Sequence, residues 1–151
     1  MQNLGDFFPE ETRRQLADNN LKIGAVLRFH VPFTNPPKTK RQIVVGFDND
    51  NILLATVLIN TEINPNVFPN QILRDLHLKL ETNNRNYIEH DSFVDCSKVR
   101  PQNKSEIIAL LTLEPTAHLG ELAPNDLAIV LEKIRNAHTI SVHEKRRFGL
   151  I

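Results

Sequence analysis

Residues 38–63, KTKRQIVVGFDNDNILLATVLINTEI, contain the two most strand-like segments of the chain. The apolar runs 43–47 and 52–59 are rich in β-branched residues, which favour strands. The residues between them, DNDN at 48–51, tolerate the backbone angles of a tight turn. Two such runs joined by an Asx-rich turn predict a β-hairpin.

The open end of this hairpin carries two residues of chemical interest. Arg41 precedes the first apolar run, and Thr61 follows the second. Because a hairpin brings its open ends together, we expect Arg41 and Thr61 to be near neighbours. Lys40 belongs to a small basic cluster at the same end.

Length and composition narrow the possible classes of protein. A chain of 151 residues fits one domain, and its 18 basic and 18 acidic residues cancel, so no global field favours nucleic acid or an anionic membrane. The single cysteine, Cys96, allows no internal disulfide and fits a reducing compartment. No apolar run approaches the ~18 residues of a membrane span, and MQNLGDFF at the start lacks the pattern of a signal peptide. We therefore expect a cytoplasmic protein with no membrane association.

Hydrophobic periodicity predicts the strand that precedes the hairpin. Residues 21–33 turn alternate side chains from Ile23 to Val31 to one side. Arg28 and His30 then share the opposite side, where they face away from the apolar residues.

The C-terminal third is predicted to be helical. Residues 124–137 place apolar side chains at i, i+3, i+4 and i+7, which indicates an amphipathic helix. Ser141 and Glu144 form a capping box that opens a second, short helix. The other predicted elements are a helix at 7–19, strands at 76–80 and 93–99, and a segment at 104–113 that is either strand or helix. Short strands in succession followed by a helix predict a mainly β protein with α elements, a small β-barrel with helical additions.

Several reactive residue types are better explained by structure than by chemistry. The six histidines include no pair at the spacing of a zinc helix, so we expect no metal or cofactor. His90-Asp91-Ser92 has the residue types of a hydrolase triad, but triads are assembled from distant positions. We expect these three residues to shape the start of a strand, and Cys96 to be a small buried residue. Five glycines form no phosphate-binding loop, which excludes P-loop chemistry.

Arg28, His30, Arg41 and Thr61 have the chemistry that metal-independent RNA cleavage requires. That reaction needs a base for the 2′-hydroxyl, an acid for the leaving 5′-oxygen and a cation at the phosphorane-like transition state. The guanidinium of Arg41 suits phosphate, and Thr61 could donate a hydrogen bond to the same oxygens. His30 could reach the same cavity. The competing interpretation is that an Arg and a Thr at strand ends are simply solvated.

The order of these segments resembles the MazF/PemK family of toxin endoribonucleases, which are small barrels with an SH3-like sheet. The matching segments cover about residues 21–137, and Gln42 stands where the family signature has proline. They are IGAVL at 23–27, KRQIVV at 40–45, LINT at 58–61, HDSFV at 90–94, and LGEL at 119–122 with the helix after it.

The resemblance implies a fold, an activity and partners. It implies an SH3-like β-barrel with a packed C-terminal helix, in which Arg41 and Thr61 are the catalytic pair. It also implies cleavage of single-stranded RNA to a 2′,3′-cyclic phosphate by a homodimer that a cognate antitoxin restrains. His30, Arg28 and Lys40 are further candidates for acid–base chemistry or RNA contact.

The domain organisation follows from the same comparison. Residues 21–137 form the barrel domain, residues 1–20 a helical extension, and residues 138–151 a short C-terminal helix. The alternative function is a non-catalytic SH3-like barrel that binds a protein or nucleic-acid partner through the same surface.

Overall fold

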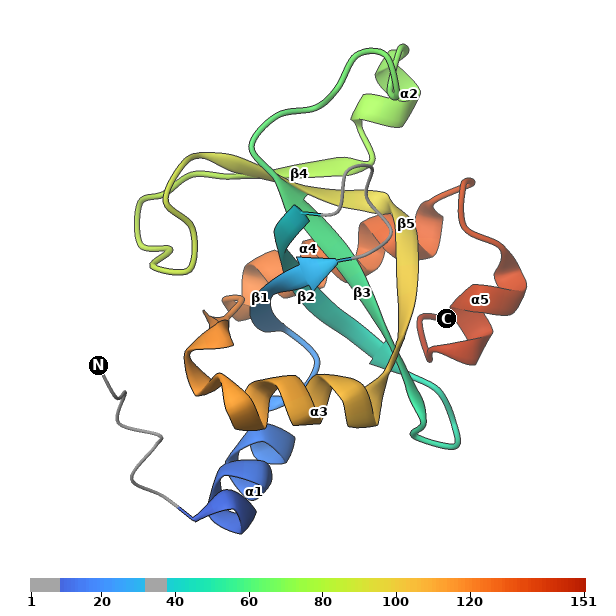
Figure 1. The fold of residues 1–151 in the computed structure, drawn as a ribbon. Helices are drawn as coiled ribbons and strands as arrows, with labels where there is room; N and C mark the ends of the chain where they lie inside the picture. Colours follow the sequence, from blue (N-terminus) through green and yellow to red (C-terminus); the bar gives the residue numbers. More distant parts are fainter. Residues whose placement is uncertain (1–8, 32–37) are drawn as a thin grey trace.

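The computed structural model describes residues 9–31 and 38–151 (Figure 1). The predicted parts of the first helix at residues 7–8 and of the first strand at residues 32–33 lie outside these ranges. In chain order the elements are α1 (Glu10–Asn20), β1 (Ala25–Val31), β2 (Lys38–Phe47), β3 (Leu53–Asn60), α2 (Gln71–Arg74), β4 (His77–Leu80), β5 (Ser92–Asn103), α3 (Lys104–Leu113), the 3₁₀ turn η2 (Pro115–Ala117), β6 (His118–Glu121), α4 (Pro124–Asn136) and α5 (Val142–Arg147).

One antiparallel sheet organises the molecule. Its six strands follow the order β4-β5-β3-β2-β1-β6, and the sheet curls into a half-barrel (Figure 1). This confirms the predicted fold class, a small β-barrel-like domain with packed helices. Helix and strand contribute almost equally, at 35% and 32%, in part because residues 104–113, left open by the sequence, form α3.

The predicted hairpin is formed by β2 and β3, but β2 starts earlier than predicted. It begins at Lys38, so Arg41 lies inside the strand rather than before it. The apolar run marks only the part of β2 that is buried. Its polar beginning is held in the sheet by pairing with β1 on one side and, from Arg41 onward, with β3 on the other. In the turn, Asp48 Oδ1 accepts hydrogen bonds from the backbone N–H groups of Ile52 and Leu53.

Strand β1 follows the predicted alternation over most of its length. Leu27 and Phe29 are buried, whereas Arg28 and His30 are exposed. The prediction for Ile23 is wrong, because its side chain is 45% exposed and precedes the strand. Gly24, with φ +96°, makes the turn that starts β1 only at Ala25.

The sheet has two covered faces, which we name after the helices that pack on them. On the α4 face, alternate strand residues such as Ile43 and Val57 pack with Val130 and Ile134. On the α3 face, residues such as Val44 pack with Ile107 and Leu111, and α1 packs outside α3. The C-terminal residues Phe148 and Leu150 belong to the α4-face core.

Two local sequence signals, a capping box and a proline, have different outcomes in the structure. The predicted capping box is confirmed, since the Ser141 side chain accepts from the Glu144 N–H. The strand predicted at 93–99 is longer in the structure, since β5 runs on through Pro101 to Asn103. A proline is tolerated there because β4 pairs only with residues 92–95 of β5, which leaves Pro101 with β3 as its single neighbour.

Candidate anion site at the end of the sheet

Two arginines lie directly opposite each other on β1 and β2. Arg28 pairs with Arg41 in the antiparallel register, so both side chains project on the α4 face, where their Cβ atoms are about 5 Å apart. Arg28 is exposed, and the Arg41 side chain is 25% exposed. Like charges in such a pair repel each other. An anion bound between the two guanidinium groups would attract both of them and so offset their mutual repulsion.

The guanidinium of Arg41 is held from one side by the loop between β4 and β5. Its Nε donates to the carbonyl oxygen of Tyr87 at 2.9 Å. One Nη lies 3.6 Å from a carboxylate oxygen of the exposed Glu89. These contacts fix the orientation of Arg41, and Glu89 is a negative charge with which an incoming anion would compete.

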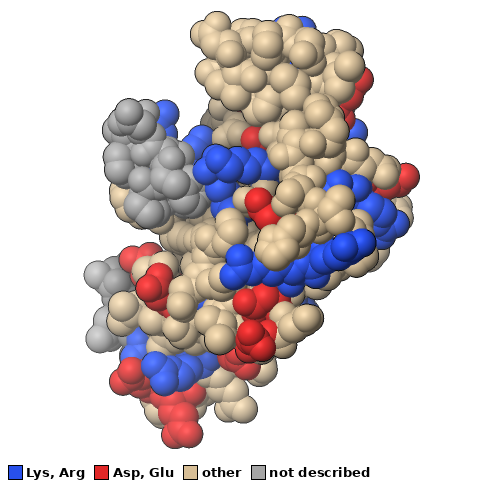
Figure 2. Space-filling view, turned by 90° about the vertical axis from the view of Figure 1, so that its right-hand side faces the viewer, with Lys and Arg blue, Asp and Glu red and all other residues tan. Residues whose placement is uncertain are grey.

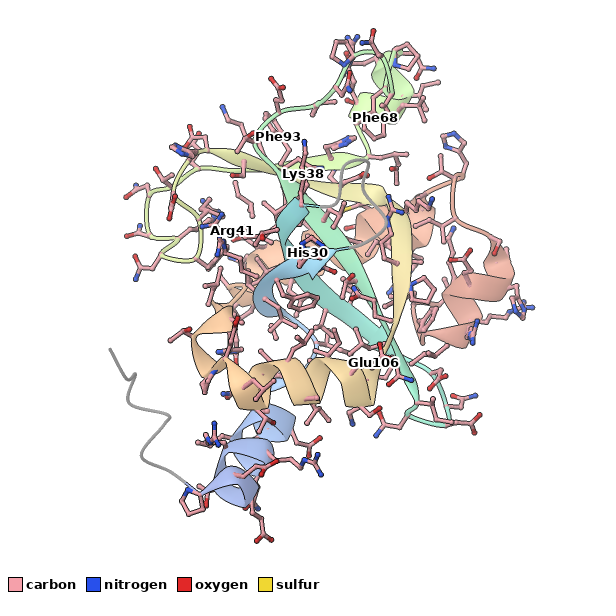
Figure 3. All side chains as sticks on the ribbon, viewed as in Figure 1. His30, Lys38, Arg41, Phe68, Phe93 and Glu106 are labelled. Atoms are coloured by element: carbon pink, nitrogen blue, oxygen red, sulfur yellow. The ribbon has the colours of Figure 1, made fainter. Side chains whose placement is uncertain are left out.

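His30 and Thr61 lie at the same end of the sheet. His30, labelled in Figure 3, is exposed and pairs with Thr39. Strand alternation therefore puts its side chain on the same face as that of Arg28. Thr61 is exposed and follows β3 directly, two residues beyond Ile59, the partner of Arg41. The hairpin therefore brings Arg41 and Thr61 to one end, although Arg41 hydrogen-bonds Tyr87 rather than Thr61.

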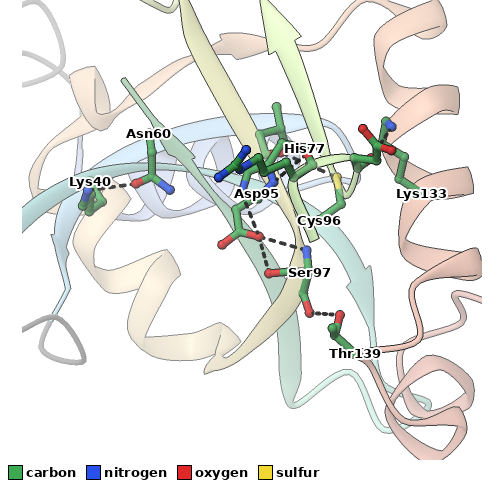
Figure 4. A network of polar contacts seen from close by, with 11 residues as sticks. Lys40, Asn60, His77, Asp95, Cys96, Ser97, Lys133 and Thr139 are labelled. Carbon is green, nitrogen blue, oxygen red and sulfur yellow. Dashed lines mark hydrogen bonds and ion pairs between the residues drawn. The ribbon is translucent and has the colours of Figure 1, made fainter. Parts of the chain in front are cut away.

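Lys40 is separated from this group by strand alternation. Its Nζ donates to Asn60 Oδ1 at 2.9 Å, on the α3 face (Figure 4). Burial, and then the charge of nearby Lys38, lower the pKa of Lys40. The basic cluster that the sequence groups together is thus divided between two faces.

Gln42, which follows Arg41, has a structural role that the sequence does not reveal. It is fully buried on the α3 face. Its Oε1 accepts hydrogen bonds from Thr56 Oγ1 at 2.8 Å and from Gln102 Nε2, and Gln102 also donates to Thr56 Oγ1 at 2.7 Å. This triad joins β2, β3 and β5 beside the position of Arg41.

Asp95 lies away from the arginines. Arg41 pairs with Ile59 of β3, and Ile59 pairs with Val94 of β5. Val94, rather than Asp95, therefore lies in line with Arg41 across the sheet. The Asp95 carboxylate accepts from the backbone N–H and the hydroxyl of Ser97, and lies 3.7 Å from His77 Nε2 (Figure 4). Its negative charge is therefore part of a local network on β4 and β5.

Cys96 and residues 90–92 are placed as the sequence predicts. Cys96 is buried, and burial followed by the neighbouring Asp95 raises its pKa to about 12, so it is a protonated thiol at neutral pH. The Asp91 carboxylate accepts from the Thr82 N–H, and Ser92 Oγ donates to the carbonyl of His90. These contacts shape the start of β5. Over residues 9–31 and 38–151, no group of three His, Cys, Asp or Glu side chains has the arrangement of a metal site.

A polar cavity of about 400 Å³ lies beside Tyr87, whose carbonyl oxygen binds Arg41, and was not predicted. It lies between the β4–β5 loop and the start of α4, with Tyr87 in its wall. It is lined by residues 81, 83–85 and 87 of the loop and by residues 121, 123 and 126. Their sequence separation explains why no local pattern could indicate it; an Asn-rich loop was the only available signal.

Charge is distributed unevenly despite the neutral total. Figure 2 shows a band of Lys and Arg side chains across the face that carries α5 and β5, with Asp and Glu side chains along its border. Arg146 and Arg147, in the last turn of α5, are exposed. This face therefore carries a local concentration of positive charge, although the net charge of the chain is zero.

Fold and site together describe a small half-barrel domain with a cross-strand arginine pair at one end of its sheet. No protein-family model matches the chain, and no curated protein matches it in sequence. None of the helices in the described part of the chain is long and apolar enough to cross a bilayer.

Proposed function

We propose that the chain is a metal-independent endoribonuclease of the MazF/PemK type that cleaves single-stranded RNA. The observation that carries the proposal is the Arg28–Arg41 pair, which offers two guanidinium groups to one phosphate at the same end of the sheet as Thr61. Arginine forks match phosphate oxygens bidentately.

In this mechanism the 2′-oxygen attacks the adjacent phosphorus and the 5′-oxygen leaves. A base takes the 2′-hydroxyl proton, and an acid supplies a proton to the leaving oxygen. The products are a 2′,3′-cyclic phosphate and a 5′-hydroxyl. Arg41 stabilises the negative charge of the transition state, Thr61 orients the phosphate, Arg28 binds the backbone, and His30 is the candidate acid or base.

The biological setting belongs to the same proposal. The chain acts as the toxin of a type II toxin–antitoxin system, as a cytoplasmic homodimer restrained by an antitoxin protein.

A second candidate is a barrel that binds its partner without cleaving it. The contacts of Arg41 with Glu89 and with the Tyr87 carbonyl favour this alternative, because they engage part of the guanidinium that catalysis would need. Binding of RNA without new 5′-hydroxyl ends would support it.

The decisive experiment uses the purified chain and a labelled single-stranded RNA in the presence of EDTA. We expect cleavage with 5′-hydroxyl ends, and a loss of at least about 100-fold in Arg41→Ala, comparable with removal of one transition-state donor. Lys79→Ala is the matched control, since Lys79 is exposed and projects on the α3 face opposite Phe93. Absence of cleavage by the wild-type chain, or equal cleavage by Arg41→Ala, would reject the enzyme.

A further inference from the structure

A row of residues on the α3 face, beside Lys40, combines positive charge with an aromatic ring. Phe93 of β5 pairs with Asn60 of β3, so the two side chains are neighbours on the same face of the sheet. Asn60 Oδ1 accepts the hydrogen bond from Lys40 Nζ at 2.9 Å (Figure 4). A single side chain therefore separates the Lys40 ammonium group from Phe93.

Lys38 brings a second positive charge to this row. It lies two residues before Lys40 on β2, so both side chains project on the α3 face. Lys40 responds to this charge, because its pKa is lowered first by burial and then by Lys38. Within residues 9–31 and 38–151, no carboxylate lies at ion-pair distance from either lysine. An anion bound between the two lysines would offset their mutual repulsion.

Phe93 supplies a flat apolar surface next to these cations. Its side chain is partly exposed at the end of the sheet (Figure 3). Pairing with Asn60 on one side and with Lys79 of β4 on the other fixes its backbone. An aromatic side chain on a sheet, beside positive charges, binds the bases of single-stranded nucleic acid by stacking. The bases of a duplex are already stacked on one another, so this combination favours a single strand.

This row and the arginine pair lie at the same end of the sheet, on opposite faces. Strand alternation puts Lys40 on the α3 face and Arg41 on the α4 face. Because adjacent strands are about 5 Å apart, Phe93 of β5 lies about 10 Å from Arg41 of β2 in the plane of the sheet. Thr61 directly follows β3, the strand between them. A strand of RNA with a phosphate at Arg28 and Arg41 can therefore cross the end of β3 and reach Phe93.

We infer that single-stranded RNA crosses this end of the sheet, with one phosphate at Arg28 and Arg41 on the α4 face and a nearby nucleotide on the α3 face. On the α3 face, a base stacks on the ring of Phe93. The phosphate of that nucleotide lies between Lys38 and Lys40. The inference rests on the proposed function, because it takes the RNA bound by the arginine pair as the ligand.

The variant Phe93→Trp reports stacking directly. The chain has no tryptophan, so this variant carries one fluorophore, whose emission a stacked base quenches. Phe47→Trp is the matched control, since Phe47 lies on the same face at the other end of β2, with Lys104 Nζ 5.5 Å from the centre of its ring. We expect a cleavage-resistant 2′-O-methyl RNA of about eight nucleotides to quench the first variant and not the second. Binding without quenching of Phe93→Trp would overturn the inference.

Affinity for the same RNA gives a second measurement, which needs no tryptophan. Phe93→Leu keeps an apolar side chain but loses the flat ring, and it should weaken binding about tenfold. Phe93→Tyr keeps the ring and should bind within about twofold of the wild-type chain. Both are measured below their melting temperatures, so that unfolding does not contribute. Equal affinity of Phe93→Leu and the wild-type chain would overturn the inference.

Salt dependence tests the phosphate contact at Lys38. Each phosphate contact of a single strand adds about 0.7 to the slope of log K against log[salt], and Lys38→Gln should reduce the slope by about that amount. Lys79→Gln is the control. The RNA reaches Phe93 from the side of β2, whereas Lys79 is exposed beyond Phe93 on β4, so the slope should not change. Equal reductions in both variants would indicate general electrostatic attraction and overturn the assignment.

The stacking site and the proposed function can fail separately. Cleavage of RNA without quenching of Phe93→Trp overturns the stacking site and leaves the proposed function standing. Quenching together with weaker binding by Phe93→Leu, but without cleavage by the wild-type chain, supports the stacking site and rejects the enzyme. Absence of RNA binding by the wild-type chain rejects both. Competition by inorganic polyphosphate as strong as that by RNA would show that charge alone is bound, and would also overturn the stacking site.

Discussion

Gly46 in β2 lies in direct contact with the main chain of Phe148. A Cβ at position 46 would stand 2.2 Å from the Phe148 carbonyl oxygen, a distance that requires the backbone to move. Glycine is therefore required at position 46 by the close approach of the C-terminal segment to the sheet.

Gly46→Ala should lower the free energy of unfolding by about 3 kcal/mol, the upper range for an overpacked core. Urea unfolding measures this. Gly149→Ala is a useful comparison, because it has open space for a Cβ and only the cost of its positive φ, roughly 1 kcal/mol. Equal losses in the two variants would show that the contact with Phe148 can relax.

The side chain of Lys145, in α5, caps the C-terminal end of α4. Its buried Nζ donates to the carbonyls of Arg135 and Ala137, both at 2.8 Å. Lys145→Met should therefore destabilise the fold by roughly 2 kcal/mol, because two carbonyls lose a charged donor. Arg146→Met, at the exposed neighbouring position, should change stability by less than about 0.5 kcal/mol. Similar losses in both variants would contradict the capping role.

The hydrogen bonds of the Gln42–Thr56–Gln102 triad should contribute jointly, not independently, to the free energy of unfolding. Gln42→Leu deprives the buried Thr56 hydroxyl of its acceptor, and Thr56→Val removes one of the two hydrogen bonds to Gln42 Oε1. Each change should cost roughly 1–3 kcal/mol. The double variant removes both partners of one bond and should cost less than the sum of the two, by about 1 kcal/mol. Strict additivity in a double-mutant cycle would show that the two residues are not coupled.

Cys96 should make the fold sensitive to alkaline pH. Its thiol titrates at about 12 in the folded chain against an ordinary pKa of 9.0, so the unfolded chain loses this proton first. Stability should therefore be unaffected by the thiol below pH 9 and should fall as pH rises toward 12, by roughly 1 kcal/mol per pH unit. Cys96→Ala should lack this part of the slope. Parallel profiles of stability against pH would contradict the assignment.

Glu89 should oppose anion binding at Arg41. Glu89→Gln removes the carboxylate 3.6 Å from the guanidinium and should strengthen binding of inorganic phosphate or RNA about threefold, as expected for a partly exposed charge pair. Glu106→Gln makes the same change of charge on α3, far from Arg41 (Figure 3). An equal gain in both variants would indicate a general electrostatic effect rather than competition at Arg41.

The elements with strong local signals could be predicted from the sequence. The hairpin, the helix at 124–137 and the capping box at Ser141 depend on periodicity, turn residues and side-chain spacing within a few positions. The start of β2 could not be predicted, because its polar first residues are placed by pairing with β1. Once that start is known, alternation alone separates Lys40 from Arg41.

Contacts between residues far apart in the sequence could not be predicted from local patterns. Gln42 meets a residue 60 positions away in Gln102, and Arg85 meets Asp126 across 41 positions. Neither pairing leaves a local pattern. The same holds for the contact of Tyr87 with Arg41, which defines the neighbourhood of the candidate site.

The position of the last helices has a consequence for synthesis of the chain. Strands β1 to β3 leave the ribosome before α3 and α4, and they carry apolar residues on both faces. Helix α3 then covers one of these faces. The α4 face receives its cover only when residues 124–150 emerge. A nascent chain that has not reached residue 124 therefore exposes this face to chaperones and to other nascent chains.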